Sequence, residues 1–477
     1  MPNFFSLPTL FLFLTLLFVS TQQQQPLLDS AEQNAVFEVL NSINSAVSWR
    51  SLFPDDLCLS APHGVVCEYF TEHTPSSATN VSFAAPLQTV HIVELSFGYV
   101  SDYTPNPPCS PNSTLSPLLF TSFKYLRKLF FYKCFTGEPV LLPNITSFVV
   151  VNNLEELVFI ENPALVGSLD VIFATFINLR RLVLTGNGVY GNISDGVGDL
   201  INVEEITLSR NQLSGGVSFD RLAKLKKLKV LDLSQNHFHG IVPESLGDLS
   251  QLLKLDLSSN FFSGNIPETL VNLQSLEFLD LSFNRFGKFG VPKFLGEMRR
   301  LKEVYLSGNL LGGRIPEIWE KLGSVSSIGF SNIGLVGNIP ASMGLYLTSL
   351  SYLGLDDNKL EGNLPEEFGL LEFANEINLE NNNLSGRVPF SVNFSTMVGQ
   401  KLKLKGNSGL CIDKVFDLGY GKNRDSFGEL EVCNKSDVLS PVLHKDIRPV
   451  SLSNSLVLGI SSSTIWCCFC IFLHNLM

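Results

Sequence analysis

Hydrophobic and polar positions alternate in short stretches that recur along most of the chain. In LDLSQNHFHG and LDLSSNFFSG, two Leu residues flank one polar residue, Asn follows three positions after the second Leu, and Gly ends the motif. Alternation over a few residues predicts a short, half-buried strand. Eight copies carry this Asn, namely Asn187, Asn211, Asn236, Asn260, Asn284, Asn309, Asn358 and Asn382. The usual spacing of 24 or 25 residues predicts a solenoid in which each repeat buries its apolar face against the next.

The same register extends beyond these eight copies. Ile333 occupies the Asn position within the one double-length gap, and the pattern continues back to Asn162 and Cys134 and forward to Asn407. We therefore predict twelve repeats, and a degenerate thirteenth, VHIVELSFG, ahead of an insertion that contains Cys109. The predicted fold class is an α/β repeat solenoid with a parallel sheet on its concave side.

Two residue types in the motif have predictable roles. The Asn side chain can both donate and accept hydrogen bonds, so a stack of Asn residues can satisfy backbone groups where each strand bends. Cys134 and Ile333 cannot do this fully, and we expect looser structure there. Phe238, Phe262 and Phe286 stand where other repeats have Leu, and they predict a buried stack of rings.

The composition argues against several classes of function. The chain has 477 residues, with 45 acidic and 33 basic side chains and a net charge of −12, so nucleic acid is not an expected partner. Motifs for nucleotide binding, zinc-dependent hydrolysis, nucleophilic hydrolysis and protein phosphorylation do not occur in the sequence. His237 and His239 flank Phe238 without a third ligand nearby, so we expect no metal there. The sequence predicts neither an enzyme nor a cofactor-binding protein.

Both ends of the chain carry hydrophobic segments. Phe4 to Val19 is an apolar run followed by small and polar residues, which predicts a secretory signal peptide. Leu456 to Met477 is a second apolar run without Lys or Arg, and the small or polar residues Ser453, Asn454 and Ser455 precede it. This order predicts a lipid (GPI) anchor, and a single membrane span is the alternative.

Six cysteines lie between these two segments. In a secreted protein an even number of cysteines predicts disulfides, and position suggests three local pairs. The pairs are Cys58 with Cys67, Cys109 with Cys134, and Cys411 with Cys433. Zinc is the competing interpretation, but these six show no ligand spacing typical of zinc.

A second motif, Gly-x-(Ile/Leu/Val)-Pro, recurs six times at repeat spacing between residues 240 and 389. Together with the LxxLxLxxNxLxG pattern, it resembles plant extracellular leucine-rich repeats, in which this segment forms a second strand on the side of the solenoid. Residues Asp29 to Ile43 predict an amphipathic helix, with Ser30 able to cap it and Gln33 three residues later. With Trp49 and the first cysteine pair, this segment resembles the N-terminal cap of plant receptor ectodomains.

Three features resemble receptor-like proteins without a kinase, of the Piriformospora indica-insensitive protein 2 group. They are the segment DLCLSAPHGVVC, the insertion from Cys109 to Cys134, and the short hydrophobic C-terminal segment. The resemblance implies a cell-surface role in root responses to a beneficial fungus. The predicted domains are a signal peptide at 1–21, an N-terminal cap at 22–88, a solenoid at 89–410 with an insertion at 99–120, a C-terminal cap at 411–436, a spacer at 437–455 and a hydrophobic tail at 456–477.

Surface positions of the strands form columns along a solenoid. In the first repeats these columns alternate in charge, as Arg127/Lys128, Glu155/Glu156, Arg180/Arg181 and Glu204/Glu205. We favour an inter-repeat ion-pair ladder over a binding patch there, because opposite charges on neighbouring strands stabilise each other. Aromatic residues appear in later columns, at Phe278, Phe283, Tyr305 and Tyr352. Exposed aromatics among small polar residues are typical of protein-recognition surfaces, so we predict a partner-binding site here.

Seven Asn-x-Ser/Thr sequons add a constraint, because an attached glycan blocks close protein contact. They begin at Asn80, Asn112, Asn144, Asn192, Asn383, Asn393 and Asn434. None lies between Asn192 and Asn383, so the predicted aromatic site would remain free of glycans.

We therefore predict a surface-tethered recognition module on the outer face of the plasma membrane or in the cell wall. It would bind a protein, peptide or glycan and signal through a separate kinase-bearing co-receptor. The alternative is a secreted or wall-associated inhibitor of microbial wall-degrading enzymes, which plant solenoids of this kind also provide.

Overall fold

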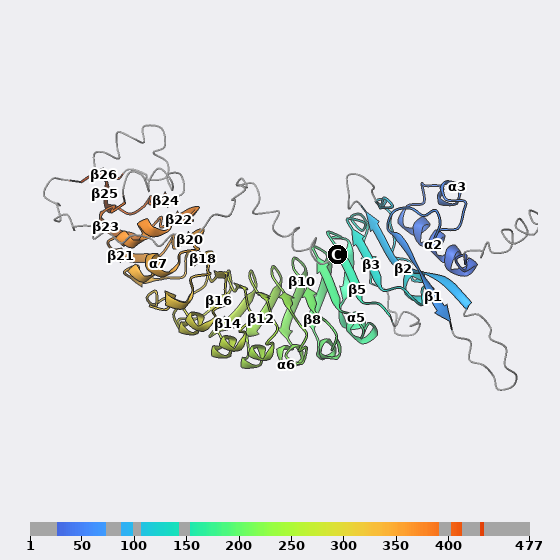
Figure 1. Cartoon of the computed structure of the whole chain (residues 1–477), viewed down its shortest axis with the longest axis horizontal. Coiled ribbons are helices and arrows are strands. Elements are labelled where there is room, and N and C mark those ends of the chain that lie inside the picture. Colours follow the sequence, from blue (N-terminus) through green and yellow to red (C-terminus); the bar gives the residue numbers. More distant parts are fainter. Residues whose placement is uncertain are drawn as a thin grey trace, which may run out of the picture. The chain divides into compact units, whose positions relative to one another are not determined.

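A long sheet of stacked repeats dominates the protein (Figure 1). The computed structural model describes residues 26–72, 87–98, 106–142, 153–390, 402–412 and 430–433. Within them, β1 (Val65–Glu72) pairs antiparallel with β2 (Leu87–Gly98), and β2 begins a run of thirteen parallel strands. The other twelve are β3 Lys128–Tyr132, β5 Glu156–Ile160, β7 Arg181–Thr185, β9 Glu205–Thr207, β11 Val230–Asp232, β13 Lys254–Asp256, β15 Phe278–Asp280, β17 Glu303–Tyr305, β18 Ser327–Gly329, β20 Tyr352–Gly354, β22 Glu376–Asn378 and β24 Leu402–Lys403. The degenerate thirteenth repeat is therefore confirmed, with its strand at β2.

Shorter strands form two further sheets on one side of the solenoid. The first contains, in chain order, β4 Val140–Leu141, β6 Leu165–Ser168, β8 Gly188–Ile193, β10 Gln212–Val217, β12 His237–Ile241, β14 Phe261–Gly264 and β16 Arg285–Phe286. The second contains β19 Val336–Gly337, β21 Lys359–Gly362, β23 Asn383–Arg387, β25 Gly409–Ile412 and β26 Glu431–Val432. The predicted second strand is thus formed in most repeats, although residues 310–316 form none, and it ends before the Pro of the Gly-x-x-Pro motif.

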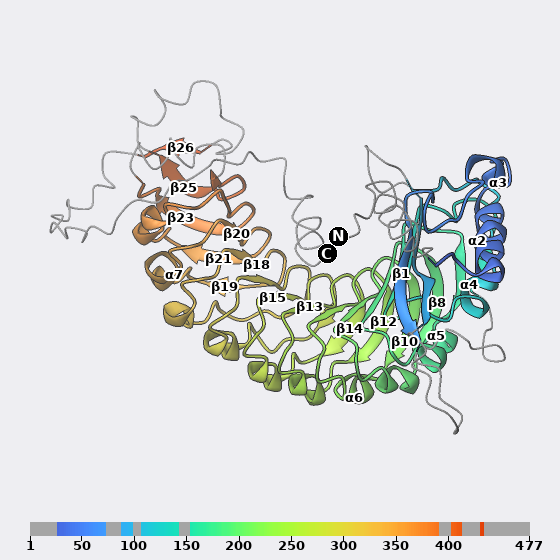
Figure 2. The same ribbon diagram turned by 45° about the vertical axis from the view of Figure 1, so that its right-hand side comes forward.

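Short helices follow these side strands and return the chain to the next repeat (Figure 2). Those that follow a side strand are α5 Asp170–Thr175, α6 Phe219–Leu222, α7 Ala341–Tyr346 and the 3₁₀ helices η1 Asp195–Asp199, η2 Glu244–Asp248, η3 Glu268–Asn272, η4 Lys293–Glu297 and η6 Glu366–Leu370. The 3₁₀ helix η5 Trp319–Lys321 belongs to the repeat without a side strand, and α2 Ser30–Ile43, α3 Trp49–Leu52 and α4 Leu118–Thr121 precede the first side strand. In four repeats the Pro of the motif directly precedes the helix, and Pro292, outside the motif, precedes η4 in the same way. Proline suits this position because it has no N–H to donate to a side strand and its fixed φ favours a helix start.

The Asn stack satisfies buried backbone groups between repeats. Asn260 is representative: its Oδ1 accepts the N–H of Phe238 at 3.0 Å, and its Nδ2 donates to the carbonyl oxygen of Leu233 at 2.9 Å. Phe238, Phe262 and Phe286 are fully buried, as the repeat pattern predicts. The apolar strand positions lie in register, with Leu231, Leu255 and Leu279 opposite one another on β11, β13 and β15.

The residue before each Asn position bends the backbone into the left-handed region. Nine non-glycine residues there have φ between 51° and 58°: Lys133, Glu161, Arg210, Gln235, Ser259, Phe283, Asn332, Asp357 and Asn381. Glycine takes the same position at Gly186, Gly308 and Gly406. The stacked repeats impose this conformation whatever the side chain, although it is unfavourable for a bulky residue such as Phe.

The ends of the solenoid are closed by helix and disulfides. Helix α2 begins as predicted, but Asp29 caps it rather than Ser30, because the Asp29 carboxylate accepts from the N–H groups of Ala31 and Glu32. Gln33 does not complete a capping box, since its side-chain oxygen accepts the N–H of Leu57 at 3.2 Å. The three disulfides, Cys58–Cys67, Cys109–Cys134 and Cys411–Cys433, are all formed.

Several predictions concern residues outside the described ones. These include the signal peptide, the hydrophobic tail with Ser453, Asn454 and Ser455, and the sequons at Asn80, Asn144, Asn393 and Asn434. The described sequons Asn112, Asn192 and Asn383 have exposed side chains. Among the residues that the structure describes, no helix has the length and apolar character needed to cross a membrane.

Candidate functional site

The concave face of the first repeats carries the predicted ladder of ion pairs. Arg180 on one strand lies between two carboxylates, 2.7 Å from Glu204 and 3.8 Å from Glu155. Arg181 is placed the same way, 2.7 Å from Glu205 and 3.6 Å from Glu156. Each cation therefore bridges two neighbouring repeats, and the predicted ion pairs between repeats are formed.

The ladder continues at both ends. Lys229 adds a further cation, with its Nζ 2.6 Å from Glu204, and hydrogen bonds from Lys229 and Arg180 lower the pKa of Glu204. At the other end Lys128 lies 3.3 Å from Glu94, and Arg127 pairs with Glu68. Because these side chains neutralise one another, the ladder presents little net charge to a ligand.

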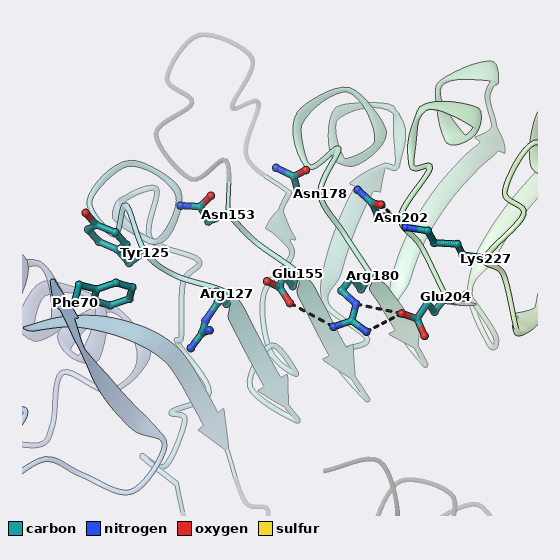
Figure 3. A pocket seen from close by; sticks show the side chains of 10 residues that line it. All are labelled: Phe70, Tyr125, Arg127, Asn153, Glu155, Asn178, Arg180, Asn202, Glu204 and Lys227. Atoms are coloured by element: carbon teal, nitrogen blue, oxygen red, sulfur yellow. Dashed lines mark hydrogen bonds and ion pairs between the residues drawn. The ribbon is translucent and has the colours of Figure 1, made fainter. Parts of the chain in front are cut away.

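A shallow hollow of about 450 Å³ lies over this ladder (Figure 3). Phe70 on β1 and Tyr125 form one end of it, with ring centroids 4.4 Å apart. A column of Asn153, Asn178, Asn202 and Lys227, one residue from each of four repeats, runs beside the charged column. Sequence reasoning missed this hollow, because Phe70 lies in the irregular N-terminal region and no repeat pattern places it beside Tyr125.

The predicted aromatic site lies farther along the same face. Phe278 and Tyr305 contact each other, with centroids 5.8 Å apart, and the Lys254 ammonium lies 5.2 Å from the Phe278 ring centroid. Both aromatic side chains are half-buried rather than fully exposed. The expectation of exposed rings is therefore wrong for this pair, which gains packing contacts.

Glycines on the following strands shape the surface beside the rings. Tyr305, Gly329 and Gly354 lie in register on β17, β18 and β20, so two adjacent strands present no side chain at this level. A Cβ atom at Gly329 would lie 2.7 Å from Tyr305 Cδ1, and one at Gly354 would lie 2.7 Å from Tyr352 Oη. The side chains of Tyr305 and Tyr352 therefore lie over these two glycines, and a side chain at either glycine would displace them.

Phe283 is the most exposed ring of the four, at 62%. It lies at the left-handed bend, with φ of 52°, and its ring lies over the equivalent residue of the next repeat, Gly308. A Cβ atom at Gly308 would come within 2.6 Å of Phe283 Cδ1. This large apolar side chain faces solvent in a conformation that disfavours it, which makes it the strongest candidate contact residue among the four.

Acidic side chains border the aromatic site on the side of the preceding repeats. Asp232, Asp256 and Asp280 lie in register on consecutive strands, with the Lys254 ammonium 2.8 Å from Asp232 and 3.7 Å from Asp256. Burial and the neighbouring Asp232 and Asp280 carboxylates raise the pKa of Asp256 to about 7. Tyr305 donates a hydrogen bond to Glu303 at 2.9 Å. The site therefore combines aromatic rings with a partly neutralised row of carboxylates.

His237 and His239 are exposed side chains on β12, and His237 stacks on Phe261 with centroids 6.0 Å apart. The described residues contain no cluster of three or more His, Cys, Asp or Glu side chains suited to a metal ion. The glycine-rich segment at 419–428 lies outside the described residues.

The stacked parallel strands, the side strands and the disulfides near both ends define a plant-type leucine-rich-repeat solenoid. Family models described as leucine rich repeat match residues 226–286, 300–322 and 349–371. A plant peptide hormone receptor, RGFR1 in complex with RGF2, has a similar structure, with a TM-score of 0.54 and 26% identity over 63% of this chain and 46% of that one.

Relatives from Arabidopsis thaliana share the repeats. Identity is 32% to Protein TOO MANY MOUTHS over 36% of this chain and 26% of that protein, and 31% to Piriformospora indica-insensitive protein 2 over 35% of each. Receptor like protein 29 is 30% identical over 39% of this chain and 37% of that protein. The predicted resemblance to plant receptor-like proteins is confirmed, although the match spans only 26–37% of the length of these relatives.

Proposed function

We propose that the protein is an extracellular recognition module that binds a peptide or a peptide segment of a protein on its concave face. The supporting observation is the exposed Phe283 ring, together with the half-buried rings of Tyr305 and Tyr352 that lie over Gly329 and Gly354. The aromatic rings supply apolar contact area with few rotatable bonds. The structurally similar plant receptor carries a peptide hormone in its complex, which supports a ligand of this class.

The charge of the site favours a ligand with basic side chains. Asp232, Asp280 and Glu303 approach the aromatic residues from the sheet, and Lys254 is the cation among them. A peptide with an apolar side chain for the rings and a Lys or Arg for the carboxylates would complement this surface. The described sequons Asn112, Asn192 and Asn383 lie outside the segment from β15 to β20, so glycans on them would attach away from its strands.

Panning a random peptide display library against the whole mature chain tests this proposal. The peptides that are enriched should bind Phe283→Gly at least about fivefold more weakly, which corresponds to the loss of about 1 kcal/mol. Glycine suits the left-handed backbone at this position, so the variant removes the ring without destabilising the fold. Tyr305→Ala should weaken binding by a similar factor.

Phe373→Ser is the matched control, because Phe373 is 67% exposed and follows η6, away from the concave sheet. This variant should bind the selected peptides as the parent does. If Phe283→Gly and Tyr305→Ala also bind them unchanged, the proposed site on the concave face is wrong.

We further propose that this module works at the outer face of the plasma membrane or in the wall, and that it signals through a kinase-bearing co-receptor. The apolar segment Leu456–Met477, which contains no Lys or Arg, supports attachment by a lipid anchor added near Ser453 to Ser455. A phosphatidylinositol-specific phospholipase should then release the protein from membranes. Recovery of the Leu456–Met477 peptide from purified, unreleased protein would instead support a membrane span. A role in root responses to a beneficial fungus rests on the similarity to Piriformospora indica-insensitive protein 2.

A further inference from the structure

A second hollow, of about 750 Å³, lies on the side of the solenoid that carries the short strands. It occupies the interruption between the two side sheets, after β16 and before β19, where residues 310–316 form no strand. We call it the basic groove. Its lining includes Lys288, Phe289, Lys293, Leu310, Arg314 and Lys359, together with glycines from three repeats.

The Asn stack explains why the side sheets are interrupted here. In neighbouring repeats an Asn oxygen accepts the N–H two positions after the preceding Asn position, as Asn309 does for Phe286 and Asn358 does for Leu335. The corresponding N–H belongs to Leu311, and Ile333 has no oxygen to offer it. Isolated backbone hydrogen bonds remain across the interruption. They run from Leu310 to Phe286, from Gly312 to Ile333, from Gly290 to Leu311 and from Val336 to Gly313. The looser structure predicted at Ile333 is therefore a local loss of the side strand.

The charge of the basic groove is unusual for this chain. Four cations line it, Lys288, Lys293, Arg314 and Lys359, and no carboxylate does. All four side chains are exposed, and within the described residues none takes part in an ion pair or a side-chain hydrogen bond. Elsewhere cations bridge neighbouring carboxylates, and the whole chain has a net charge of −12. The groove therefore concentrates uncompensated positive charge, which attracts a polyanion.

The shape of the groove indicates what kind of polyanion fits. Lys288, Arg314 and Lys359 come from repeats that are one and then two steps apart, so the charges extend along the solenoid instead of surrounding one point. At Gly290 an added Cβ atom would meet nothing within 4 Å, so part of the lining is open backbone. Phe289 is 73% exposed beside the cations and offers a flat apolar face.

We propose that the basic groove binds a linear polysaccharide that carries carboxylates, such as a chain of uronic acids. The cations would pair with successive carboxylates, with Arg314 able to hold one by two parallel hydrogen bonds. The Phe289 ring would pack against the C–H face of a sugar, and the open backbone at Gly290 would leave room for the sugar rings. An acidic peptide could pair with the cations, but it would not explain why the exposed Phe289 ring lies beside open backbone at Gly290.

Binding of polygalacturonate to the whole mature chain, measured by biolayer interferometry at low and high salt, tests this proposal. The parent should bind polygalacturonate, with affinity falling as salt rises, and should not bind the fully methyl-esterified polymer of the same length. The variant Lys288→Gln/Lys293→Gln/Arg314→Gln/Lys359→Gln should bind at least tenfold more weakly. Its thermal midpoint should not fall, because these side chains have no partners to lose.

A matched variant removes four exposed cations elsewhere, namely Lys224→Gln/Arg299→Gln/Arg300→Gln/Lys405→Gln. It changes the net charge equally and should alter binding less than twofold. If it weakens binding as much as the groove variant does, attraction is general and the proposed site is wrong. Binding of the esterified polymer equal to that of polygalacturonate would also overturn the proposal.

The variant Phe289→Ser distinguishes a polysaccharide ligand from an acidic peptide ligand. It should weaken polygalacturonate binding about threefold or more and leave the binding of poly-glutamate of equal charge unchanged. Tighter binding of poly-glutamate than of polygalacturonate, with no effect of Phe289→Ser, would replace the polysaccharide with a peptide ligand. Because Phe283 does not line the groove, peptides selected by panning should bind the groove variant normally. Failure of one proposal therefore leaves the other testable.

Discussion

Replacing a single Asn of the stack should destabilise the solenoid more than any surface change of similar size. Asn260→Ala removes the acceptor for the buried N–H of Phe238, at 3.0 Å, and the donor to the carbonyl oxygen of Leu233, at 2.9 Å. A buried backbone group that loses its partner costs about 1–3 kcal/mol, so two such groups predict a loss of about 2–6 kcal/mol. Urea unfolding followed by circular dichroism measures this loss as a lower midpoint.

Two control variants separate hydrogen bonding from cavity formation. Asn260→Leu removes the same hydrogen bonds while filling most of the volume, so it should destabilise nearly as much as Asn260→Ala. Asn265→Ala changes an exposed Asn in the same repeat and should alter stability by less than about 0.5 kcal/mol. The reasoning fails if Asn260→Ala and Asn265→Ala unfold at the same urea concentration.

Two further predictions concern charge. Glu204→Lys/Glu205→Lys places like charges beside Arg180, Arg181 and Lys229. The free energy of unfolding should therefore fall by about 0.2–1 kcal/mol for each lost ion pair, and by less at high salt. The variant should bind the panned peptides as the parent does. The carboxyl of Asp256 has a pKa of about 7 in the folded chain, above its ordinary value of 3.8. Between these pH values the folded chain therefore binds more protons than the unfolded chain, and stability should fall as the pH rises from about 4 to 7. Asp256→Asn should flatten this slope in urea midpoints by about 1 kcal/mol or more over that range, and an equal slope in parent and variant would contradict the assignment.

Sequence periodicity predicts the fold well because each repeat contacts mainly its neighbours. The Asn positions locate nearly every strand of the long sheet, and VHIVELSFG proves to be a repeat because its strand pairs in parallel with β3. The alternating charges of Arg180 and Glu204 also predict their contact, since equivalent positions of adjacent repeats must lie opposite each other.

Contacts outside the repeat pattern are less predictable. The hollow beside Phe70 depends on a strand that pairs antiparallel with β2, and no period relates that strand to Tyr125. The burial of Tyr305 and Tyr352 depends on which neighbouring strands carry Gly, which changes how much of each ring a solvent molecule can reach. The basic groove results from the absence of a side-chain oxygen at Ile333. The sequence shows this substitution, but it does not show whether the side strand still forms without that hydrogen-bond acceptor.

The interruption at Ile333 also affects how the solenoid should come apart. Asn side chains join most repeats to their neighbours through hydrogen bonds between residues 22 to 28 positions apart. Most junctions between repeats are therefore held by equivalent hydrogen bonds. At residues 310–316 the side strand is missing and one Asn link is absent, so this junction depends on the long sheet, the apolar core and isolated backbone hydrogen bonds such as that from Gly312 to Ile333. Because each repeat contacts mainly its neighbours, a force applied to the two ends should separate the repeats first at the weakest junction. Pulling on the two ends should therefore divide the protein into two separately cooperative blocks, with the first rupture between β16 and β19.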